Sequence, residues 1–116
     1  MAIPPLRNGS MQIVKETSGC QTLYRLIDGE VDQPLGRAVI SENDGQVRFH
    51  TLYVEPGWRG RGYRKALMKA VLREGGDKII SLCTGFGNVP FFERYGFEIT
   101  EATDTLVFMK RGSLKP

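Results

Sequence analysis

Residues 54–67 read Val-Glu-Pro-Gly-Trp-Arg-Gly-Arg-Gly-Tyr-Arg-Lys-Ala-Leu, and they join the end of a strand to the start of a helix through a glycine turn. The apolar run before this stretch closes at Pro56, which has no N–H to offer a sheet ladder. From Tyr63 onward, apolar residues recur at the three- and four-residue spacing of one helix face. A helix start after such a turn presents unpaired N–H groups and a positive dipole end. The stretch therefore predicts an anion site of the kind that holds phosphate.

The side chains of the turn favour the same conclusion. Glycines let the backbone approach a ligand closely, and basic residues surround them: Gly60 and Gly62 stand among Arg59, Arg61, Arg64 and Lys65. Two familiar phosphate motifs do not fit this spacing. A P-loop needs a Gly-Lys-Ser/Thr ending, and the dinucleotide fingerprint needs a third glycine where Lys65 stands.

A second block, residues 88–97, reads Asn-Val-Pro-Phe-Phe-Glu-Arg-Tyr-Gly-Phe. Together the two blocks resemble the GNAT superfamily of acyl-CoA N-acyltransferases. The first matches the family's Leu-x-Val-x-Pro and Arg/Gln-x-x-Gly-x-Gly/Ala elements, except that Arg64 replaces the final small residue. The second is similar to Phe-Tyr-x-x-x-Gly-Phe, with Phe92 at the tyrosine position. The resemblance covers residues 46–97, about half of the chain.

The resemblance implies acetyl-CoA as co-substrate and no metal. In the family, two neighbouring parallel strands splay apart and the pantetheine arm lies between them; here those strands would be 47–54 and 78–83. The residues that would bind the coenzyme are Leu52, Tyr53, Val54, Arg59, Gly60, Arg61, Gly62, Tyr63, Arg64, Lys65, Asn88, Phe91 and Phe92. The backbone of the first three would pair with the pantetheine amides and hold the acyl carbonyl.

The resemblance also implies a catalytic residue. His50, the only histidine, occupies a strand position where some family members carry a proton relay; the alternative is a histidine that simply packs or hydrogen-bonds in the sheet. Phe92 cannot replace the family's usual acid, a tyrosine. Cys83, Tyr95 or a water could protonate the leaving thiolate instead, although we expect Cys83 to be a small buried residue and Tyr95 to fill the core.

Three residues of the first block have open roles. Arg64 would either contact a phosphate or point to solvent. Trp58 and Tyr63 could both stack on adenine, but Tyr63 is better explained as the first core residue of the helix, and the role of Trp58 stays open.

The expected fold is a single α+β (α/β) GNAT domain over residues 11–111, with a flexible arm at 1–10 and a flexible tail at 112–116. Its mixed sheet of about six to seven strands would contain a βαβ phosphate-binding unit. The expected strands are 11–16, 22–27, 35–41, 47–54, 78–83, 97–99 and 106–109, with helices at 63–73 and 89–95.

Only residues 17–21 separate the first two expected strands, which is too short for one stable helix. The two helices that usually cover the acceptor pocket in the family are therefore expected to be reduced or absent. The acceptor side would then be open, or closed by a second subunit in a homodimer or by the substrate. An open cleft suits a bulky acceptor such as a protein side chain.

The composition of the chain bears on its cellular location and on the kinds of partner it could have. The 116 residues carry a net charge of +3 and 41% hydrophobic residues, with no apolar stretch of roughly 20 residues that would span a membrane. Two cysteines form neither a disulfide framework nor a metal spacing. These features favour a cytoplasmic protein with no membrane partner. Much of the basic charge surrounds the glycine turn, so nucleic acid is an unlikely partner.

Two functions follow from these observations. The first is an N-acetyltransferase that moves an acetyl group from acetyl-CoA to a primary amine by direct attack in a ternary complex. The alternative is an acetyl-CoA-binding GNAT-like sensor or interaction module with little or no activity. His50 favours the enzyme, whereas Phe92 and the missing helices favour the sensor.

Overall fold

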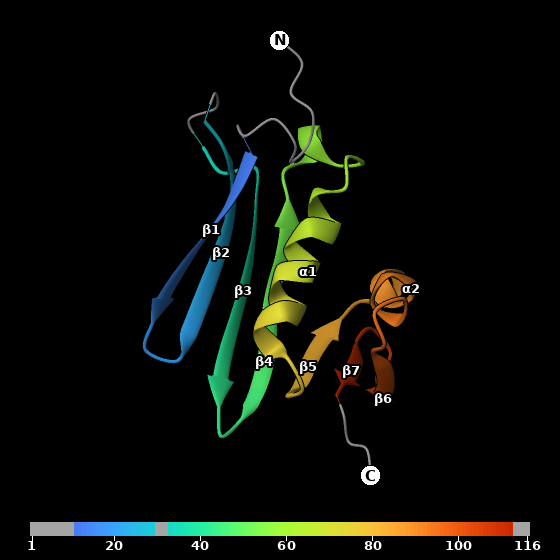
Figure 1. Ribbon diagram of the computed structural model, residues 1–116. Coiled ribbons are helices and arrows are strands. Elements are labelled where there is room, and N and C mark those ends of the chain that lie inside the picture. Colours follow the sequence, from blue (N-terminus) through green and yellow to red (C-terminus); the bar gives the residue numbers. More distant parts are fainter. Residues whose placement is uncertain (1–10, 30–32, 113–116) are drawn as a thin grey trace.

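A computed structural model of the protein describes residues 11–29 and 33–112, and it contains one seven-stranded sheet with two α-helices (Figure 1). The strand order is β1-β2-β3-β4-β5-β7-β6. The elements are β1 (Met11–Ser18), β2 (Gln21–Asp28), β3 (Gly36–Asn43), β4 (Gln46–Val54), the 3₁₀ turn η1 (Pro56–Trp58), α1 (Tyr63–Gly75), β5 (Ile79–Thr84), the 3₁₀ turn η2 (Phe86–Asn88), α2 (Val89–Glu93), β6 (Glu98–Ala102) and β7 (Val107–Arg111).

The sheet is mixed, as predicted. Strands β1 to β4 form an antiparallel meander, β4 and β5 are parallel, and β7 pairs antiparallel with both β5 and β6. Helix α1 connects the two parallel strands, so the predicted βαβ unit is present. Between β1 and β2 the chain needs only the two residues Gly19 and Cys20, because Ser18 pairs directly with Gln21. The prediction that the two N-terminal helices are absent is confirmed.

The hairpin between β3 and β4 follows from its turn residues. Asp44 and Gly45 both have positive φ angles, 53° and 76°. Two consecutive residues in this region form the turn that matches the twist of two antiparallel strands, and Asp-Gly is a preferred sequence for it. The turn aligns Asn43 with Gln46 and starts the register of the β3–β4 pair.

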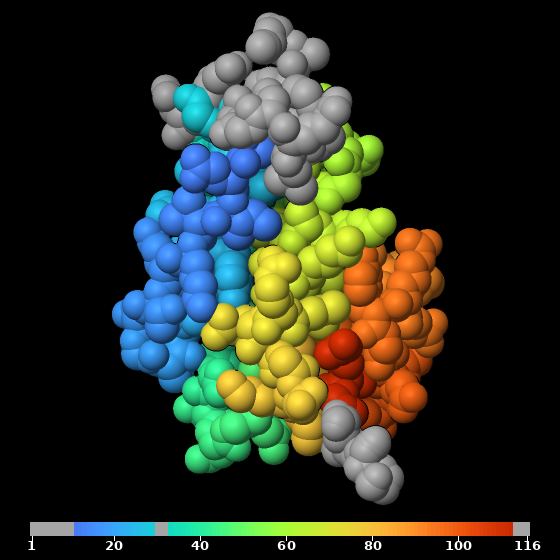
Figure 2. All heavy atoms as spheres, viewed as in Figure 1, coloured from blue at the N-terminus to red at the C-terminus, as the bar shows by residue number. Residues whose placement is uncertain are grey.

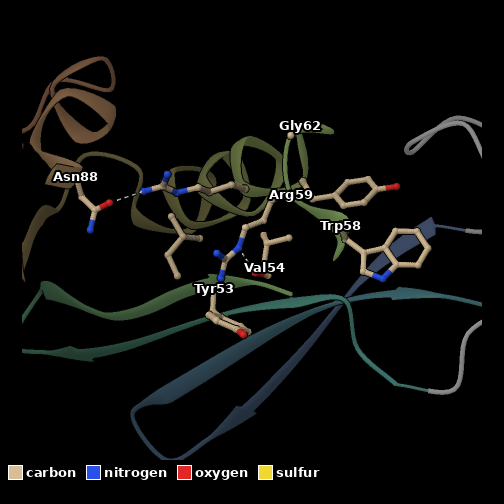
Figure 3. Close-up of a pocket in the computed structure, with 10 residues that line it drawn as sticks. Tyr53, Val54, Trp58, Arg59, Gly62 and Asn88 are labelled. Atoms are coloured by element: carbon tan, nitrogen blue, oxygen red, sulfur yellow. Dashed lines mark hydrogen bonds between the residues drawn. The ribbon is translucent and has the colours of Figure 1, made fainter. Parts of the chain in front are cut away.

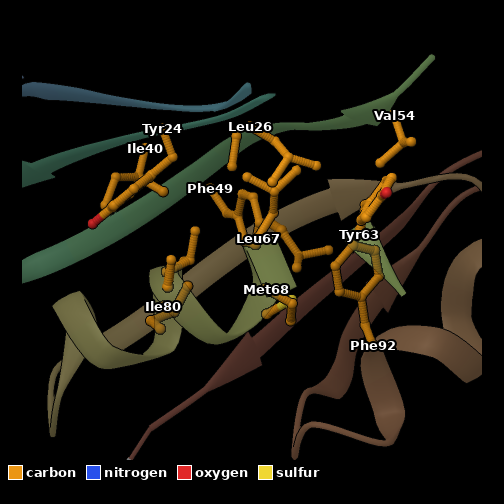
Figure 4. Close-up of a cluster of buried hydrophobic side chains, with 14 of the residues drawn as sticks. Tyr24, Leu26, Ile40, Phe49, Val54, Tyr63, Leu67, Met68, Ile80 and Phe92 are labelled. Atoms are coloured by element: carbon orange, nitrogen blue, oxygen red, sulfur yellow. The ribbon is translucent and has the colours of Figure 1, made fainter. Parts of the chain in front are cut away.

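The core lies between the sheet and α1 (Figure 4). The helix contacts β2, β3 and β4, and its Tyr63, Leu67 and Met68 are at most 1% exposed. Gly36 on β3 faces this helix, since a Cβ there would lie 2.8 Å from the Tyr53 carbonyl oxygen and 3.2 Å from Leu67 Cδ1. In the space-filling view, α1 lies between the strands β1 and β2 and the region of α2 (Figure 2).

Element boundaries differ from the prediction at several ends. Helix α1 continues to Gly75, and α2 stops at Glu93, because the N–H groups of Tyr95 and Gly96 bond back three residues to the carbonyls of Phe92 and Glu93. The expected loop before α2 contains the 3₁₀ turn Phe86–Asn88, and the last two strands are both longer than predicted. The expected flexible arm, and all of the expected tail except Gly112, lie outside the described residues.

Alkaline pH should destabilise the fold through Tyr24, which is 4% exposed. Burial and the nearby Glu74 carboxylate raise the pKa of Tyr24 from 10.0 to about 12, and its hydroxyl donates a 3.4 Å hydrogen bond to Glu74 Oε1. A raised pKa favours the folded state below pH 10, and this contribution is lost as pH rises through 12. Tyr24→Phe should therefore flatten the fall of the melting temperature between these pH values. An equal fall in both proteins would contradict the assignment.

Candidate active site

The site begins where β4 and β5 separate. These strands pair at only three positions, Gln46 with Ile79, Val47 with Ile80 and Arg48 with Ser81, although β4 continues to Val54 and β5 to Thr84. Beyond the third pair, β4 stays bound to β3 and β5 stays bound to β7. The predicted splay is therefore present, and no ladder joins the facing edges of the two strands beyond the third pair.

A β-bulge in β4 places His50 at this opening. Phe49 pairs with Ile40 and Thr51 pairs with Val39, so His50 is the extra residue of the bulge. The histidine is exposed, and its Nε2 lies 2.8 Å from the Ser41 hydroxyl on β3. This hydrogen bond is what a histidine with only a structural role in the sheet would make. The His50 side chain also borders the opening between β4 and β5, as the proton relay would.

Two adjoining cavities occupy the splay. The first, of about 350 Å³, lies against the glycine turn and is lined by Leu52, Tyr53, Val54, Trp58, Arg59, Gly60, Gly62, Tyr63, Arg64 and Asn88 (Figure 3). The second, of about 310 Å³, is lined by Arg37, Phe49, His50, Thr51, Leu52, Tyr53, Arg64, Leu82, Cys83, Thr84, Asn88 and Phe92. Because four residues border both, the cavities form one cleft from the start of α1 to His50.

The glycine turn borders the first cavity with free backbone. Gly60 and Gly62 have φ angles of 81° and 88°, and no atom lies within 4 Å of a Cβ built on either. Gly62 is the residue before α1, and no side chain caps the helix start. Such a start is well suited to an anion, and the open space leaves room for one to approach.

The basic residues of the turn take different places. Arg59 turns back under the turn, where its Nε donates a 2.7 Å hydrogen bond to the Val54 carbonyl oxygen (Figure 3). This carbonyl belongs to the backbone that the family resemblance assigns to pantetheine. Arg61 stacks over Trp58, with its Cζ 4.8 Å from the ring centroid. Lys65 is exposed on α1 and, like Arg61 and Phe91, lies outside the lining of both cavities.

Arg64 lies across the cleft instead of pointing to solvent. Its Nη2 donates a 3.3 Å hydrogen bond to Asn88 Oδ1, and its Cζ stands 3.8 Å from the Phe91 ring centroid. Asn88 in turn donates to the Thr84 hydroxyl at 3.0 Å, so the start of α1 is tied to the end of β5. Partial burial and then the charge of Arg59 lower the pKa of Arg64. A bound anion near Arg64 would offset this lowering by stabilising the charged form.

The candidates for the acid differ from expectation. Phe92 is 6% exposed and its ring contacts Phe49, Phe91 and Phe97 with centroids 6.2, 5.2 and 5.7 Å away. The prediction that Cys83 is buried is wrong: the side chain is exposed and borders the second cavity. The reason is alternation, since the neighbouring Leu82 points into the core. Tyr95 is half-buried against Phe91, 5.3 Å between centroids.

In residues 11–29 and 33–112, no group of three or more His, Cys, Asp or Glu side chains could hold a metal ion. No helix in those ranges is both long and apolar enough to cross a membrane.

Sequence comparison identifies the family. A model of the acetyltransferase (GNAT) domain matches residues 19–99, which is more than half of the chain. The protein belongs to the GNAT acetyltransferase family. No curated protein sequence matches the chain significantly. The matched region contains both predicted motifs and all of the cleft residues named above.

Solved structures agree on the fold of this GNAT domain. Escherichia coli ElaA is 20% identical, with a TM-score of 0.68 over 91% of this chain and 74% of its own. The PaiA N-acetyltransferase of Thermoplasma acidophilum, solved in complex with coenzyme A, is 12% identical, with a TM-score of 0.67 over 80% and 61%. PH1933 of Pyrococcus horikoshii is 19% identical, with a TM-score of 0.70 over 78% and 64%. At these identities the likeness concerns the fold alone.

Several cleft residues were not predicted. Thr84 and Arg37 line the second cavity, and Ser41 holds His50, but none of them belongs to a family motif. Ser41 and Arg37 reach the site through cross-strand pairing with β4. The Asp-Gly turn fixes how β3 and β4 align at their start. Counting residue pairs from this turn would have placed Ser41 near His50. Arg37 lies beyond the bulge, where counting from the turn fails.

Coenzyme A should bind this GNAT cleft and raise the melting temperature. Trp58 is the only tryptophan and borders the first cavity, so its fluorescence should also change in a saturable way. Gly62→Val should remove both responses, because a β-branched side chain is strained at a φ of 88° and enters the free space at the helix start. Gly57→Val is the matched control in the same turn, with no positive φ and no close neighbour. Equal responses in both variants would refute the assignment.

Proposed function

We propose that this GNAT domain is an N-acetyltransferase that moves the acetyl group of acetyl-CoA to a primary amine within a ternary complex. The observation that carries the proposal is the continuous cleft, which connects an uncapped helix start at Gly62 with His50 on the bulge. One end suits phosphates and the other presents a base. Between these two ends, the cleft runs along the edge of β4 that faces β5. An extended arm with amide groups, such as pantetheine, could pair with the backbone there.

The coenzyme would be held along this cleft by three kinds of group. The backbone N–H groups after Gly62 and the guanidinium groups of Arg59 and Arg64 would bind the pyrophosphate. The free edge of residues 52–54 would pair with the pantetheine amides. Trp58 closes the far wall, and its ring offers a surface on which adenine could stack. We propose no binding role for Lys65.

The reaction needs one bond formed and one broken. The amine nitrogen attacks the thioester carbonyl carbon, the new C–N bond forms, and the C–S bond breaks to release coenzyme A. A lysine amine has a pKa of about 10.4 in water, so it must lose a proton to react. Holding the two reactants in line is worth up to ~10⁵ M in effective molarity or more, and a positioned base adds roughly 10²–10⁴-fold.

His50 is the proposed base, and Ser41 is its positioning residue. When Nε2–H donates to the Ser41 oxygen, the other ring nitrogen keeps its lone pair free to accept the proton of the amine. The departing thiolate takes a proton from solvent or from Cys83, which is exposed at the cleft. With Phe92 in place of a tyrosine, we expect a modest rate.

A cytoplasmic location is part of the proposal. Cys20 and Cys83 are both free thiols, which suits a reducing compartment. The second candidate function, an acetyl-CoA sensor without turnover, is favoured by the buried Phe92 at the family's acid position and by the missing helices between β1 and β2. Steady release of free coenzyme A with a broad panel of amines separates the two functions.

Replacing His50 tests the base. His50→Ala should lower turnover by roughly 10²-fold, while the affinity for coenzyme A changes little. The pH–rate profile should lose a limb near neutrality. Ser41→Ala keeps the imidazole and should have a smaller effect, with the limb retained. Unchanged turnover in His50→Ala would give the role to water or to the free-base fraction of the acceptor.

Replacing Phe92 tests the acid position. Phe92 borders the second cavity, so the hydroxyl of Phe92→Tyr has space to face the thioester, and transfer should become faster. Phe97→Tyr is the matched control. Phe97 is 2% exposed and borders neither cavity, so its added hydroxyl should cost stability, ~1–3 kcal/mol, without a gain in rate. No gain in Phe92→Tyr, together with undetectable turnover of the unmodified protein, would favour the sensor.

A further inference from the structure

The sheet face opposite α1 carries a row of arginines beside the cleft. Arg25 pairs with Arg37, and Arg37 pairs with Tyr53, so these three side chains share one face of the sheet. Gly36, the neighbour of Arg37, faces Leu67 of α1. Because side chains alternate along a strand, Arg37 points away from the helix. Arg48 lies on the same face, since its neighbours Val47 and Phe49 are buried in the core.

The charges on this face are not balanced. Arg25 forms an ion pair with Glu16, but no carboxylate of the described residues lies within ion-pair distance of Arg37 or Arg48. Glu55 lines a hollow beside Arg37, and its Oε1 accepts a 3.5 Å hydrogen bond from the Tyr53 hydroxyl. Like charges directly opposite each other destabilise a sheet. Arg37 therefore lies opposite a like charge and has no ion-pair partner of its own among the described residues, and a negatively charged ligand would supply one.

The position of Arg37 suits the binding of a negatively charged ligand. Its guanidinium lies over the Tyr53 ring, with Cζ 4.9 Å from the centroid. A guanidinium group binds a carboxylate in a planar, two-bonded geometry. Arg37 also lines the second cavity together with His50. A carboxylate bound there would lie next to the proposed acceptor amine.

Positive charge flanks His50 on both sides. Arg48 is two residues before it on β4, about 7 Å along the strand, and Tyr53 with its partner Arg37 is three residues after it, about 10 Å. Carboxylates of the same face stand at its edges instead: Glu16 on β1, and Glu98 and Glu101 on β6. The centre of the face around the cleft is therefore basic.

We propose that this face binds an acidic peptide segment that presents a lysine to the cleft, with carboxylates on both sides of that lysine meeting Arg37 and Arg48. The inference rests on the proposed function and names its acceptor. A peptide fits because the two arginines lie on opposite sides of His50 along an open face. The apolar side chains on this face, such as Leu23 and Val39, are only half-buried, whereas Leu26 and Ala38 under α1 are fully buried.

The test compares two peptides with a single lysine, one flanked by glutamates and one by glutamines at the same positions. Acetylation of the acidic peptide should have a kcat/KM roughly 10-fold higher, and the preference should shrink as salt rises. Arg37→Gln and Arg48→Gln should each lower kcat/KM for the acidic peptide by roughly threefold, the size of one exposed ion pair. Each should lower the value for the neutral peptide by less, so that the preference for the acidic peptide shrinks in both variants.

Lys69→Gln is the matched control, because it removes one positive charge from an exposed position on α1, away from this face. A second measurement does not depend on turnover. Labelled acidic and neutral peptides in which norleucine replaces the lysine are titrated with the protein and coenzyme A, and binding is followed by fluorescence anisotropy. The acidic peptide should bind more tightly, and Arg37→Gln should weaken it while Lys69→Gln should not.

Equal binding of the two peptides overturns the inference, even where the protein shows no turnover. A failure of the proposed function has a different signature, namely no thermal shift with coenzyme A and no coenzyme A release with any amine. Two further results would also overturn the inference. One is a free amino acid such as 4-aminobutyrate acetylated as well as the acidic peptide. The other is a dimer in sedimentation experiments that Arg37→Glu dissociates, which would assign the face to a second copy of the chain.

Discussion

The whole site depends on one feature of the sheet: β4 and β5 pair at three positions and then separate. Each strand is held on its other side, β4 by eight positions of β3 and β5 by five positions of β7, whereas only three pairs join the two. Sheet twist and the bulge at His50 then carry the strands apart. The unpaired edges would cost free energy if they were buried dry, because backbone N–H and C=O groups need partners. A ligand with amides of its own is the natural occupant, and the separation thus creates both the space and the need for one.

Around this gap, polar and cationic groups replace the missing ladder. Arg59 satisfies the Val54 carbonyl, and Arg64 with Asn88 bridges from α1 to β5. Both guanidinium groups are on flexible side chains, so they can exchange these contacts for phosphate oxygens without disturbing the core. Phe92 and Phe49 close the apolar floor of the second cavity by edge-to-face contact. The cleft therefore combines packed aromatic side chains on one side with charged side chains that can change their contacts when a ligand binds.

Residue patterns predicted the elements that local chemistry determines. The Asp44–Gly45 turn, the helix after Gly62 and the seven strands each have a signal within a few residues, and the structure contains them all. The long-range features were harder. The bulge at His50 has no glycine or proline to mark it, and the place of Arg37 beside the cleft depends on register beyond that bulge. The exposure of Cys83 was misjudged because residue type was used where strand alternation with Leu82 decides the answer.

The two-residue turn at Gly19 and Cys20 has a consequence for the energetics of the domain. Among the described residues, α1 covers one face of β2 to β4, where most side chains are buried, and the side chains of the opposite face are half-buried or exposed. A small domain already buries a smaller share of its surface than a large one. Placing arginines on the second face limits the apolar area exposed there, and the Glu16–Arg25 pair balances one of them. Arg37 and Arg48 lie next to the cleft and are not balanced in this way. The charge imbalance is thus greatest around His50, the proposed base, and binding an anionic acceptor there would remove it.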